Sequence, residues 1–408
     1  MSYRPRVKNN ACTNAHPVGC YYNVYGQMLN AIDKPIKSSE GKTALVIGSS
    51  SGAGLATRIA LTFAAGMDTI GVYCERAAQP HKYGSAGWYN NQAFEYHARR
   101  ANKMALSTNQ DAFKKNAKDW VIQKLQQSGK KIDVLVYSLS ATKRNVKGVA
   151  EYRSAIKPIE QDFQGKDLDV FAGQLQSVEV EKASEEEIDN TVKVMGGEGW
   201  QEWVSRLMDA GVLAENFKTV AYSYSGTEHT QAMYGQGTLG DAKSHLHETA
   251  IELDYALEEI NGHAGIGLLQ AAITPSSAVI PSMSLYISVL QQQQKLAGKS
   301  ESMLEQVSRL FKDGVFKDEL FTDHTEGEHY LRVDNLERDS EVQLAVSDVL
   351  SRLDGSNLNE LLNTDKFKTE FLQQFGFAHD FINYEQKPDP LTPPAIHDFS
   401  HMSMQQAG

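Results

Sequence analysis

Tyr234 and Lys243 are the two side chains whose types suggest acid–base chemistry most directly. A phenol can donate a proton to a developing negative charge, and a nearby ammonium lowers the phenol pKa from its ordinary value of about 10. The two residues are nine positions apart, which is about 2.5 turns of α-helix. On one continuous helix they would therefore face opposite ways and could not act together.

Glycines within this interval change the expectation. Gly235, Gly237 and Gly240 stand between the tyrosine and the lysine, and glycine disfavours an unbroken helix. We therefore predict that the tyrosine lies on a loop and that a helix begins near Asp241, with the lysine in its first turn. Such a loop allows the phenol to fold back toward the ammonium.

A cofactor site is indicated by the sequence "TALVIGSSSGAGLATRIALTFAAG". Its first five residues are apolar and partly β-branched, as in a strand covered on both faces, and a helical pattern follows the glycines. Gly48, Gly52 and Gly54 give G-x3-G-x-G, which is the spacing of short-chain dehydrogenases. This turn predicts binding of a dinucleotide diphosphate at the helix N-terminus; a tight turn that binds nothing is the alternative.

The end of the next predicted strand, "TIGVYCE", indicates which cofactor is bound. Glu75 closes this strand, 21 positions after Gly54. A carboxylate there accepts hydrogen bonds from ribose hydroxyls and repels a 2′-phosphate, which predicts NADH in preference to NADPH. The neighbouring Arg76 leaves the opposite preference open, because a guanidinium could hold the phosphate.

Two further strands end at positions suited to cofactor contacts. "MALSTNQDA" ends at Asp111-Ala112 and "IDVLVYSLS" ends at Leu139-Ser140, with the helical pattern "FKKNAKDWVIQKLQQSGKK" between them. This alternation predicts a parallel, doubly wound sheet, in which the carboxyl ends of the strands share one edge. We expect the cofactor to lie along that edge.

The rest of the chain extends the same α/β pattern. The pattern weakens from about residue 145 to 200, where one helix is predicted behind Ser184. "KTVAYSYSG" and "GIGLLQAAIT" predict two more strands, and "DAKSHLHETAIELDYALEEI" and "SLYISVLQQQQKL" predict two helices. We predict a single enlarged Rossmann-type domain, like that of short-chain dehydrogenases, with insertions and additional N- and C-terminal elements. Its parts are a cofactor-binding half at about 40–145, a catalytic and substrate-binding half at about 146–300, and a C-terminal extension at about 301–408.

Composition narrows the class of protein. A net charge of −11 and a pI near 5.6 argue against nucleic-acid binding. No apolar run reaches the roughly 18 residues of a membrane span, and the N-terminus lacks the apolar core of a signal peptide. Three cysteines suit reduced thiols in the cytoplasm. We therefore expect a cytoplasmic enzyme with no membrane contact.

No metal site is expected. His245 and His247 cannot share a helix face, and the pair His397 and His401 stands in a C-terminal tail. Cysteines and a histidine also lie at a possible metal spacing in "CTNAHPVGC".

Seven longer motifs point to a family: "ACTNAHPVGC", "GSSSGAGLATR", "GSAGWYNNQAF", "DVLVYSLS", "TVKVMGGEGW", "KTVAYSYSG" and "SSAVIP". Over nearly its whole length, the chain resembles the FabV-type enoyl-ACP reductases and the similar trans-2-enoyl-CoA reductases. The resemblance implies NADH-dependent reduction of the 2,3-double bond of an enoyl thioester, carried by acyl carrier protein or CoA, by a monomeric enzyme. It also implies a structural role for the N-terminal cysteine–histidine segment.

The family uses a Tyr-x8-Lys pair, which Tyr234 and Lys243 match. The resemblance implies that Tyr234 donates the proton, that Lys243 supports the phenol and the cofactor, and that Tyr224 lies at the substrate thioester. The implied cofactor contacts are Gly48, Ser49, Ser50, Ser51, Gly52, Ala53, Cys74, Glu75, Asp111, Ala112, Leu139, Ser140, Lys243, Ala272, Ile273 and Thr274.

Some residues depart from the family pattern. Pro275 stands where a glutamine is expected and Ser140 where alanine is typical, and "AMYGQGT" is unusually rich in glycine. These departures bear on chain-length preference and turnover more than on the reaction class. The alternatives are a carbonyl reductase or alcohol dehydrogenase of the short-chain type, and a non-catalytic NAD(H)-binding sensor. The basic segment "ATKRNVK" is a candidate docking patch for an acidic carrier protein, or a solvated loop.

Overall fold

A parallel sheet of seven strands forms the centre of the computed structural model, which describes residues 2–146, 148, 150–317 and 329–391. The strand order is β5-β4-β3-β6-β11-β12-β13, so the chain fills one half of the sheet outward from β3 and then the other half outward from β6. This doubly wound order confirms the predicted fold class and places a crevice at the carboxyl ends of β3 and β6. The strands are β3 (Thr43–Ile47), β4 (Asp68–Tyr73), β5 (Ala105–Asn109), β6 (Ile132–Tyr137), β11 (Leu213–Ser223), β12 (His263–Leu268) and β13 (Tyr330–Arg332).

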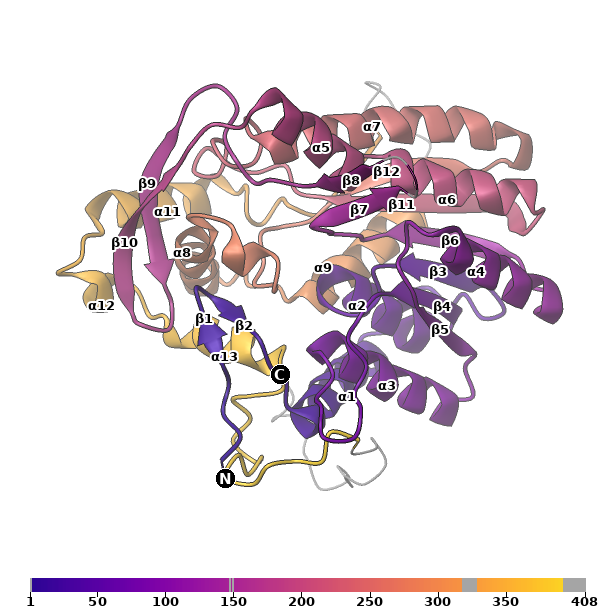
Figure 1. Ribbon diagram of the computed structural model, residues 1–408, viewed down its shortest axis with the longest axis horizontal. Helices are drawn as coiled ribbons and strands as arrows, with labels where there is room; N and C mark the ends of the chain where they lie inside the picture. The colour runs from indigo at the N-terminus through magenta and orange to yellow at the C-terminus, as the bar shows by residue number, and fades with distance from the viewer. Residues whose placement is uncertain (1, 147, 149, 318–328, 392–408) are drawn as a thin grey trace.

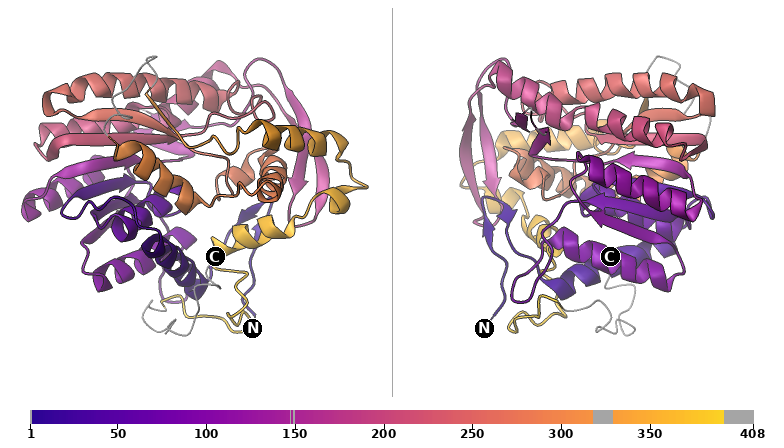
Figure 2. Two further views of the ribbon diagram at one scale, coloured as in Figure 1. Left: turned by 180° about the vertical axis from the view of Figure 1, so that it is seen from behind. Right: turned by 45° about the vertical axis from the view of Figure 1, so that its right-hand side comes forward.

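Helices cover both faces of the sheet, as Figures 1 and 2 show. One hydrophobic core lies between the sheet and helices α1 (Pro17–Asp33), α2 (Gly52–Ile59), α3 (Ala86–Arg100) and α9 (Met303–Leu310). A second core lies under α4 (Lys115–Ser128), α6 (Glu198–Asp209) and α7 (Thr238–Leu257), where Trp200 and Trp203 are almost fully buried. Coverage on both faces explains why every residue of strands such as "TALVI" is buried and why only its first residue, Thr43, is polar.

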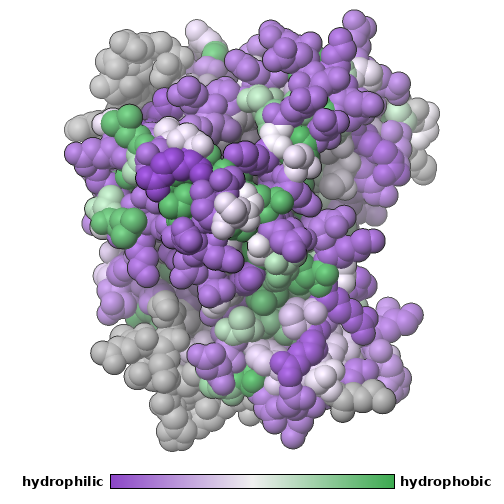
Figure 3. All heavy atoms as spheres, turned by 90° about the vertical axis from the view of Figure 1, so that its left-hand side faces the viewer, coloured by the Kyte–Doolittle hydropathy of each residue, from purple (hydrophilic) through white to green (hydrophobic). Residues whose placement is uncertain are grey.

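A third layer packs beside the sheet, at the left of Figure 1. Its core surrounds α8 (Met283–Leu296) and includes side chains of α11 (Ser340–Arg352), α12 (Leu358–Leu361), α13 (Asp365–Gln373) and the hairpin β9–β10 (Phe163–Asp169, Gln174–Val180). The outer surface of this side is mostly hydrophilic, with smaller hydrophobic groups between (Figure 3). The hairpin accounts for part of the region in which the sequence pattern is weak, because its strands alternate between exposed and half-buried residues.

Shorter elements complete the fold. The hairpins β1–β2 (Val7–Lys8, Ala11–Cys12) and β7–β8 (Lys143–Val146, Ala150–Arg153) stand outside the central sheet. Helix α5 (Glu185–Met195) begins behind Ser184, as predicted, and Ser184 forms a reciprocal capping box with Glu187. The central sheet takes strands from all three of the proposed parts of the chain, and that division remains a prediction.

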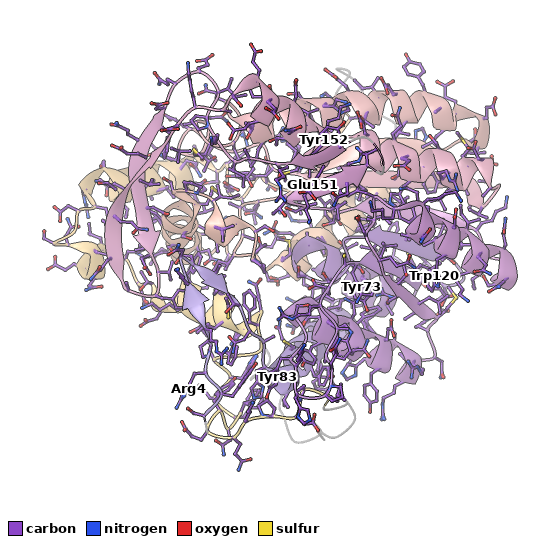
Figure 4. All side chains as sticks on the ribbon, in the orientation of Figure 1. Arg4, Tyr73, Tyr83, Trp120, Glu151 and Tyr152 are labelled. Atoms are coloured by element: carbon purple, nitrogen blue, oxygen red, sulfur yellow. The ribbon has the colours of Figure 1, made fainter. Side chains whose placement is uncertain are left out.

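The C-terminal residues 375–391, here called the C-terminal strap, cross back to the start of the chain. The Tyr3 amide donates to the Tyr384 carbonyl at 2.8 Å, and the His16 amide donates to the Phe375 carbonyl at 2.8 Å. The ring of Tyr3 stacks on that of Tyr83, with centroids 4.5 Å apart, and Figure 4 shows Tyr83 and Arg4 at this end of the molecule. The strap thus fixes the N-terminal segment to the body of the protein.

Candidate active site

The predicted cofactor turn joins β3 to α2 in a conformation that requires glycine. Gly48 has φ +85° and Gly52 has φ +52°, both in the left-handed region. A Cβ atom on Gly54 would lie 2.1 Å from the Gly48 carbonyl oxygen, so the helix can begin this close to the strand only with glycine there. Ser51 precedes the helix without a side-chain hydrogen bond to its first turn, which leaves those N–H groups available to an anion.

The other predicted cofactor residues follow the carboxyl ends of neighbouring strands. Cys74 and Glu75 follow β4, Asp111 and Ala112 lie beyond β5, Leu139 and Ser140 lie beyond β6, and Ala272, Ile273 and Thr274 lie beyond β12. Because these strands are parallel, the residues share one edge of the sheet with the glycine turn. The structure therefore brings the predicted set together at the expected edge, while their contacts with a cofactor remain a prediction.

A cavity of about 360 Å³ opens beside the glycine turn. Ser51 and Gly52 line one wall, and Ala272, Ile273 and Thr274 line another. A Cβ atom on Gly52 would lie 3.6 Å from Thr274 Cγ2, so the two segments face each other closely.

Asn90 provides an independent sign that the cavity fits a nucleotide. It also lines the cavity, and its amide donates to the Ser50 carbonyl at 3.0 Å. Its Oδ1 is buried and has no hydrogen-bond partner among the described residues. This oxygen can accept a hydrogen bond from a hydroxyl or amide of a bound nucleotide.

Glu75 is held rigidly where the adenosine ribose is expected. Its two carboxylate oxygens accept hydrogen bonds from the hydroxyls of Ser50, at 2.7 Å, and Ser85, at 2.5 Å. The backbone amide of Glu75 donates to Asn109 Oδ1 at 2.8 Å. The neighbouring Arg76 is exposed, and its Nε donates to the Tyr83 carbonyl at 3.2 Å. Glu75 is thus fixed at the sheet edge while Arg76 turns to the Tyr83 carbonyl, and contact of Glu75 with the ribose remains a prediction.

Tyr234 lies on a turn, as predicted, but the following helix begins earlier than predicted. The Tyr234 amide donates to the Thr230 carbonyl at 2.9 Å, and α7 begins at Thr238 rather than near Asp241. Lys243 is therefore in the second turn of α7, and the prediction that it lies in the first turn is wrong. Gly240 does not delay the helix.

The close packing of the turn explains why a glycine is found inside this helix. A Cβ atom on Gly240 would lie 2.2 Å from the Gly235 carbonyl oxygen, so the turn can pack onto the first residues of α7 only if position 240 is glycine. The Thr238 hydroxyl donates to the Ala155 carbonyl at 2.5 Å and fixes the start of the helix. Glycine here serves close approach of two backbones rather than helix termination.

Burial changes the acidity of both members of the pair. Desolvation, and secondarily the charge of Glu337, raises the pKa of Tyr234 to about 12. Desolvation lowers the pKa of Lys243 to about 8. The expectation of a lowered phenol pKa is therefore wrong, because burial and the Glu337 charge raise it. Tyr234 is fully protonated at neutral pH, as a proton donor must be.

Lys243 is held close to the end of β11. Its Nζ donates to the Tyr222 carbonyl at 3.4 Å, which is a long hydrogen bond. The side chain is half-buried, and its lowered pKa leaves it mostly charged at pH 7. It is thus a cation with bonding capacity left over for a ligand.

A pH dependence follows from this lowered pKa. If Lys243 binds the cofactor as a cation, kcat/KM for NADH falls roughly tenfold per pH unit above a midpoint near pH 8, where the lysine loses its proton. Tyr234, with a pKa of about 12, does not titrate in this range. Lys243→Arg should move the midpoint upward, because arginine stays charged. A pH profile of initial rates measures the midpoint in both enzymes. An unchanged midpoint in the arginine variant would show that another group causes the fall of kcat/KM above pH 8.

Tyr224 stands at the carboxyl end of β11, directly after Ser223. Its ring meets that of Tyr234 edge to face, with centroids 4.8 Å apart and an interplanar angle of 86°. Its hydroxyl donates to Glu337 Oε1 at 2.6 Å. The two tyrosines predicted to meet the substrate are therefore in direct contact.

Glu337 is a residue of the site that the sequence did not reveal. It lies in the turn between β13 and α11 and is 1% exposed. Burial raises its pKa, and the hydrogen bonds that it accepts oppose this shift. The only sequence signal is a carboxylate in "RVDNLERDSE", which does not differ from the surface acids around it.

The histidine and cysteine candidates have structural contacts. His16 caps α1 by accepting a hydrogen bond from the Gly19 amide, and Cys20 is fully buried in the core. His247 stacks on Tyr330, and His245 accepts from the Gly197 amide. His397 and His401 lie outside the described residues. Within the described part of the chain, no group of three potential ligands is placed to hold a metal ion.

The fold and the site together define a nicotinamide-dependent reductase with a doubly wound sheet, a glycine turn for the diphosphate and a tyrosine–lysine pair. Family models described as the trans-2-enoyl-CoA reductase catalytic region and the NAD(P)H binding domain of trans-2-enoyl-CoA reductase match residues 82–316 and 2–80. The chain belongs to the family of enoyl-ACP and trans-2-enoyl-CoA reductases. A third model, described as an enoyl reductase FAD binding domain, matches residues 325–387.

Individual relatives match nearly the whole chain. The enoyl-[acyl-carrier-protein] reductase [NADH] of Shewanella frigidimarina is 40% identical over 392 residues, which are 96% of this chain and 98% of that protein. The structure of Clostridium acetobutulicum trans-2-enoyl-CoA reductase with NADH matches with a TM-score of 0.91 and 34% identity, over 98% of this chain and 100% of that one. The Treponema denticola enzyme with NAD matches with a TM-score of 0.88 and 37% identity, over 95% and 98%.

Proposed function

We propose that this protein reduces the 2,3-double bond of trans-2-enoyl thioesters with NADH. The observation that carries the proposal is that a protonated Tyr234 and the Lys243 cation stand at the same sheet edge as the glycine turn and Glu75. The relatives described above carry names for this reaction and cofactor. Bound NADH would supply the hydride that reaches the substrate β-carbon.

The protein's own residues then manage the negative charge. As the β-carbon is reduced, charge accumulates on the thioester oxygen. The Tyr234 hydroxyl donates a hydrogen bond to that oxygen and stabilises the enolate, before the α-carbon is protonated. Lys243 holds the cofactor through its positive charge. Tyr224 holds the ring of Tyr234 on the substrate side.

NADH rather than a flavin is the assigned cofactor, although one matching family model has FAD in its name. The described part of that region supplies the edge strand β13 and helices packed on α8. Val346 on α11 and Phe371 on α13 are fully buried in that packing. These side chains build the third core, whereas the nucleotide-type turn lies between β3 and α2.

Comparison of two CoA substrates tests the proposed reaction. The enzyme should oxidise NADH rapidly with crotonyl-CoA, which offers a double bond, and slowly with acetoacetyl-CoA, which offers a carbonyl group. Absorbance at 340 nm follows the cofactor, and mass spectrometry of butyryl-CoA identifies the product. The reverse preference would indicate a carbonyl reductase. NADH binding without turnover of either substrate would indicate a sensor.

The basic segment "ATKRNVK" bears on whether the enoyl thioester is carried by acyl carrier protein or by CoA. Arg144, in the basic segment considered as a docking patch, donates to Glu198 Oε2 at 2.9 Å and to the Lys193 carbonyl at 2.9 Å. Lys143 lies 3.7 Å from Glu151, and Lys147 lies outside the described residues. Because two of its charges are already paired, this segment gives no support for docking of an acidic carrier.

The proposal also covers the oligomeric state and the cellular compartment of the protein. We infer a monomer, as the family resemblance implies, which sedimentation at several protein concentrations would test. Cys12, Cys20 and Cys74 are free thiols, which suits the reducing cytoplasm. Within the described residues, no helix is long and apolar enough to cross a bilayer.

A further inference from the structure

Glu337 lies where the carboxyl ends of three neighbouring strands meet. Tyr224 follows β11, Ala271 lies just beyond β12, and Glu337 itself lies beyond β13. The Tyr224 hydroxyl donates to Oε1 of the carboxylate at 2.6 Å, and the Ala271 amide donates to Oε2 at 2.7 Å. A single side chain thus bridges the segment predicted to meet the substrate and the segment that leads to Ala272–Thr274 beside the glycine turn.

The Glu337 carboxylate acts only as a hydrogen-bond acceptor. A third donor, the Tyr286 hydroxyl, reaches Oε1 at 2.7 Å, so all three polar partners donate and neither carboxylate oxygen needs a proton of its own. The Gln343 amide donates to the Tyr286 oxygen at 3.2 Å and to the Glu337 carbonyl at 2.6 Å. These bonds hold both the backbone and the carboxylate of Glu337 in place.

We propose that Glu337 is a positioning residue that holds Tyr224 and the Ala271–Thr274 loop in one fixed geometry. The inference rests on the proposed function, since it assigns Tyr224 to the substrate and the Ala271–Thr274 loop to the cofactor. It follows that the Tyr224 proton points toward Glu337 and away from the substrate. Tyr224 therefore supports Tyr234 through its ring, 4.8 Å away edge to face, and Tyr234 supplies the hydrogen bond to the enolate.

Glu337→Gln tests this arrangement because it keeps the shape of the side chain and reverses its hydrogen bonds to the two phenols. A glutamine can accept from the Ala271 amide only if its NH2 group faces the two phenols. The Tyr224 proton is then released from its partner, and the position of the ring is no longer fixed. We expect kcat with crotonyl-CoA and NADH to fall about 10- to 100-fold, since small displacements from the reactive geometry have effects of this size.

Two further readouts separate positioning from a general loss of structure. The Kd for NADH, measured by fluorescence titration, should stay within about threefold of that of the unmodified enzyme, and the deuterium isotope effect on kcat with 4-deuterated NADH should increase. Tyr224→Phe removes the same bond from its other end and should have a similar effect. The double variant should lose no more kcat than the stronger single variant, since both substitutions break the same hydrogen bond between Tyr224 and Glu337.

Asp334→Asn is the matched control. Asp334 is also 1% exposed and lies in the same segment, but it accepts from Ser225 at 2.9 Å and pairs with Arg332 at 2.8 Å instead of contacting Tyr224. It should lower the melting temperature while kcat is retained. The proposal is overturned if Glu337→Gln keeps kcat within threefold, if the control loses kcat equally, or if the double variant shows additive losses. Failure of the unmodified enzyme to reduce crotonyl-CoA would instead overturn the proposed function.

Discussion

Tyr234→Phe should lower kcat with crotonyl-CoA by about 10²- to 10⁴-fold, the usual contribution of a positioned proton donor. The substitution removes one hydroxyl and leaves the ring, so the edge-to-face contact with Tyr224 is preserved. The phenol has a pKa of about 12 and is protonated at every pH used in such assays. The loss should therefore be the same at pH 6 and at pH 8, which distinguishes a lost hydrogen-bond donor from a lost titrating group.

Measurements of NADH binding show whether the loss of kcat comes from the chemical step or from weaker binding of the cofactor. NADH affinity of the Tyr234→Phe variant should stay near that of the unmodified enzyme, because the glycine turn and Glu75 are untouched. Tyr255→Phe is a suitable control, since Tyr255 lies on α7 with 72% of its surface exposed. Turnover of Tyr234→Phe within threefold of the control would refute the assignment of the proton donor.

Glu75→Ser should shift the cofactor preference toward NADPH by about 100-fold in the ratio of kcat/KM values. The carboxylate opposes a 2′-phosphate by like-charge repulsion, which costs several kcal/mol at close range. A serine removes the charge and leaves room, and Ser85, whose hydroxyl donates to Glu75, becomes free to bind the phosphate. Parallel titrations of NADH and NADPH at fixed crotonyl-CoA measure the ratio.

Two companion variants make the cofactor result specific. Glu179→Ser removes an exposed carboxylate on β10, outside the central sheet, and should leave the ratio unchanged. Arg76→Ala tests the competing assignment, since a guanidinium that bound the 2′-phosphate would make this variant lose NADPH activity selectively. A ratio that stays constant in Glu75→Ser would show that the carboxylate does not face the ribose.

Local patterns in the sequence were sufficient for the glycine turn, the strands and the helices α2 and α4 of the cofactor half, but not for α3. "TALVI" is observed as β3 with the predicted bounds, because a strand buried on both faces is mostly apolar along its length. The turn at Gly48 and Gly52 was predictable because its left-handed backbone restricts the residue type. Such signals lie within a few residues of one another, so they can be recognised without knowledge of the tertiary structure.

Features that depend on distant contacts were not predictable. Glu337 binds Tyr224 across 113 positions of sequence, and β13 has only three residues, so neither has a local pattern. The start of α7 differs from the prediction for a related reason. Helix propensity alone makes Gly240 a helix breaker, but its role is set by the Gly235 carbonyl that packs against it. Tertiary packing overrode the local preference.

The C-terminal strap also constrains the order in which the chain can fold. Tyr89 donates to the Pro390 carbonyl at 3.0 Å, across 301 positions, and the amide of Tyr3 reaches Tyr384. During synthesis Tyr3 and Tyr89 leave the ribosome long before Tyr384 and Pro390, so these two contacts must wait until the strap has been made. Contacts of such high sequence separation form slowly because a large loop must close. The contacts between Tyr3 and the C-terminal strap are therefore among the last native contacts of this enzyme to form.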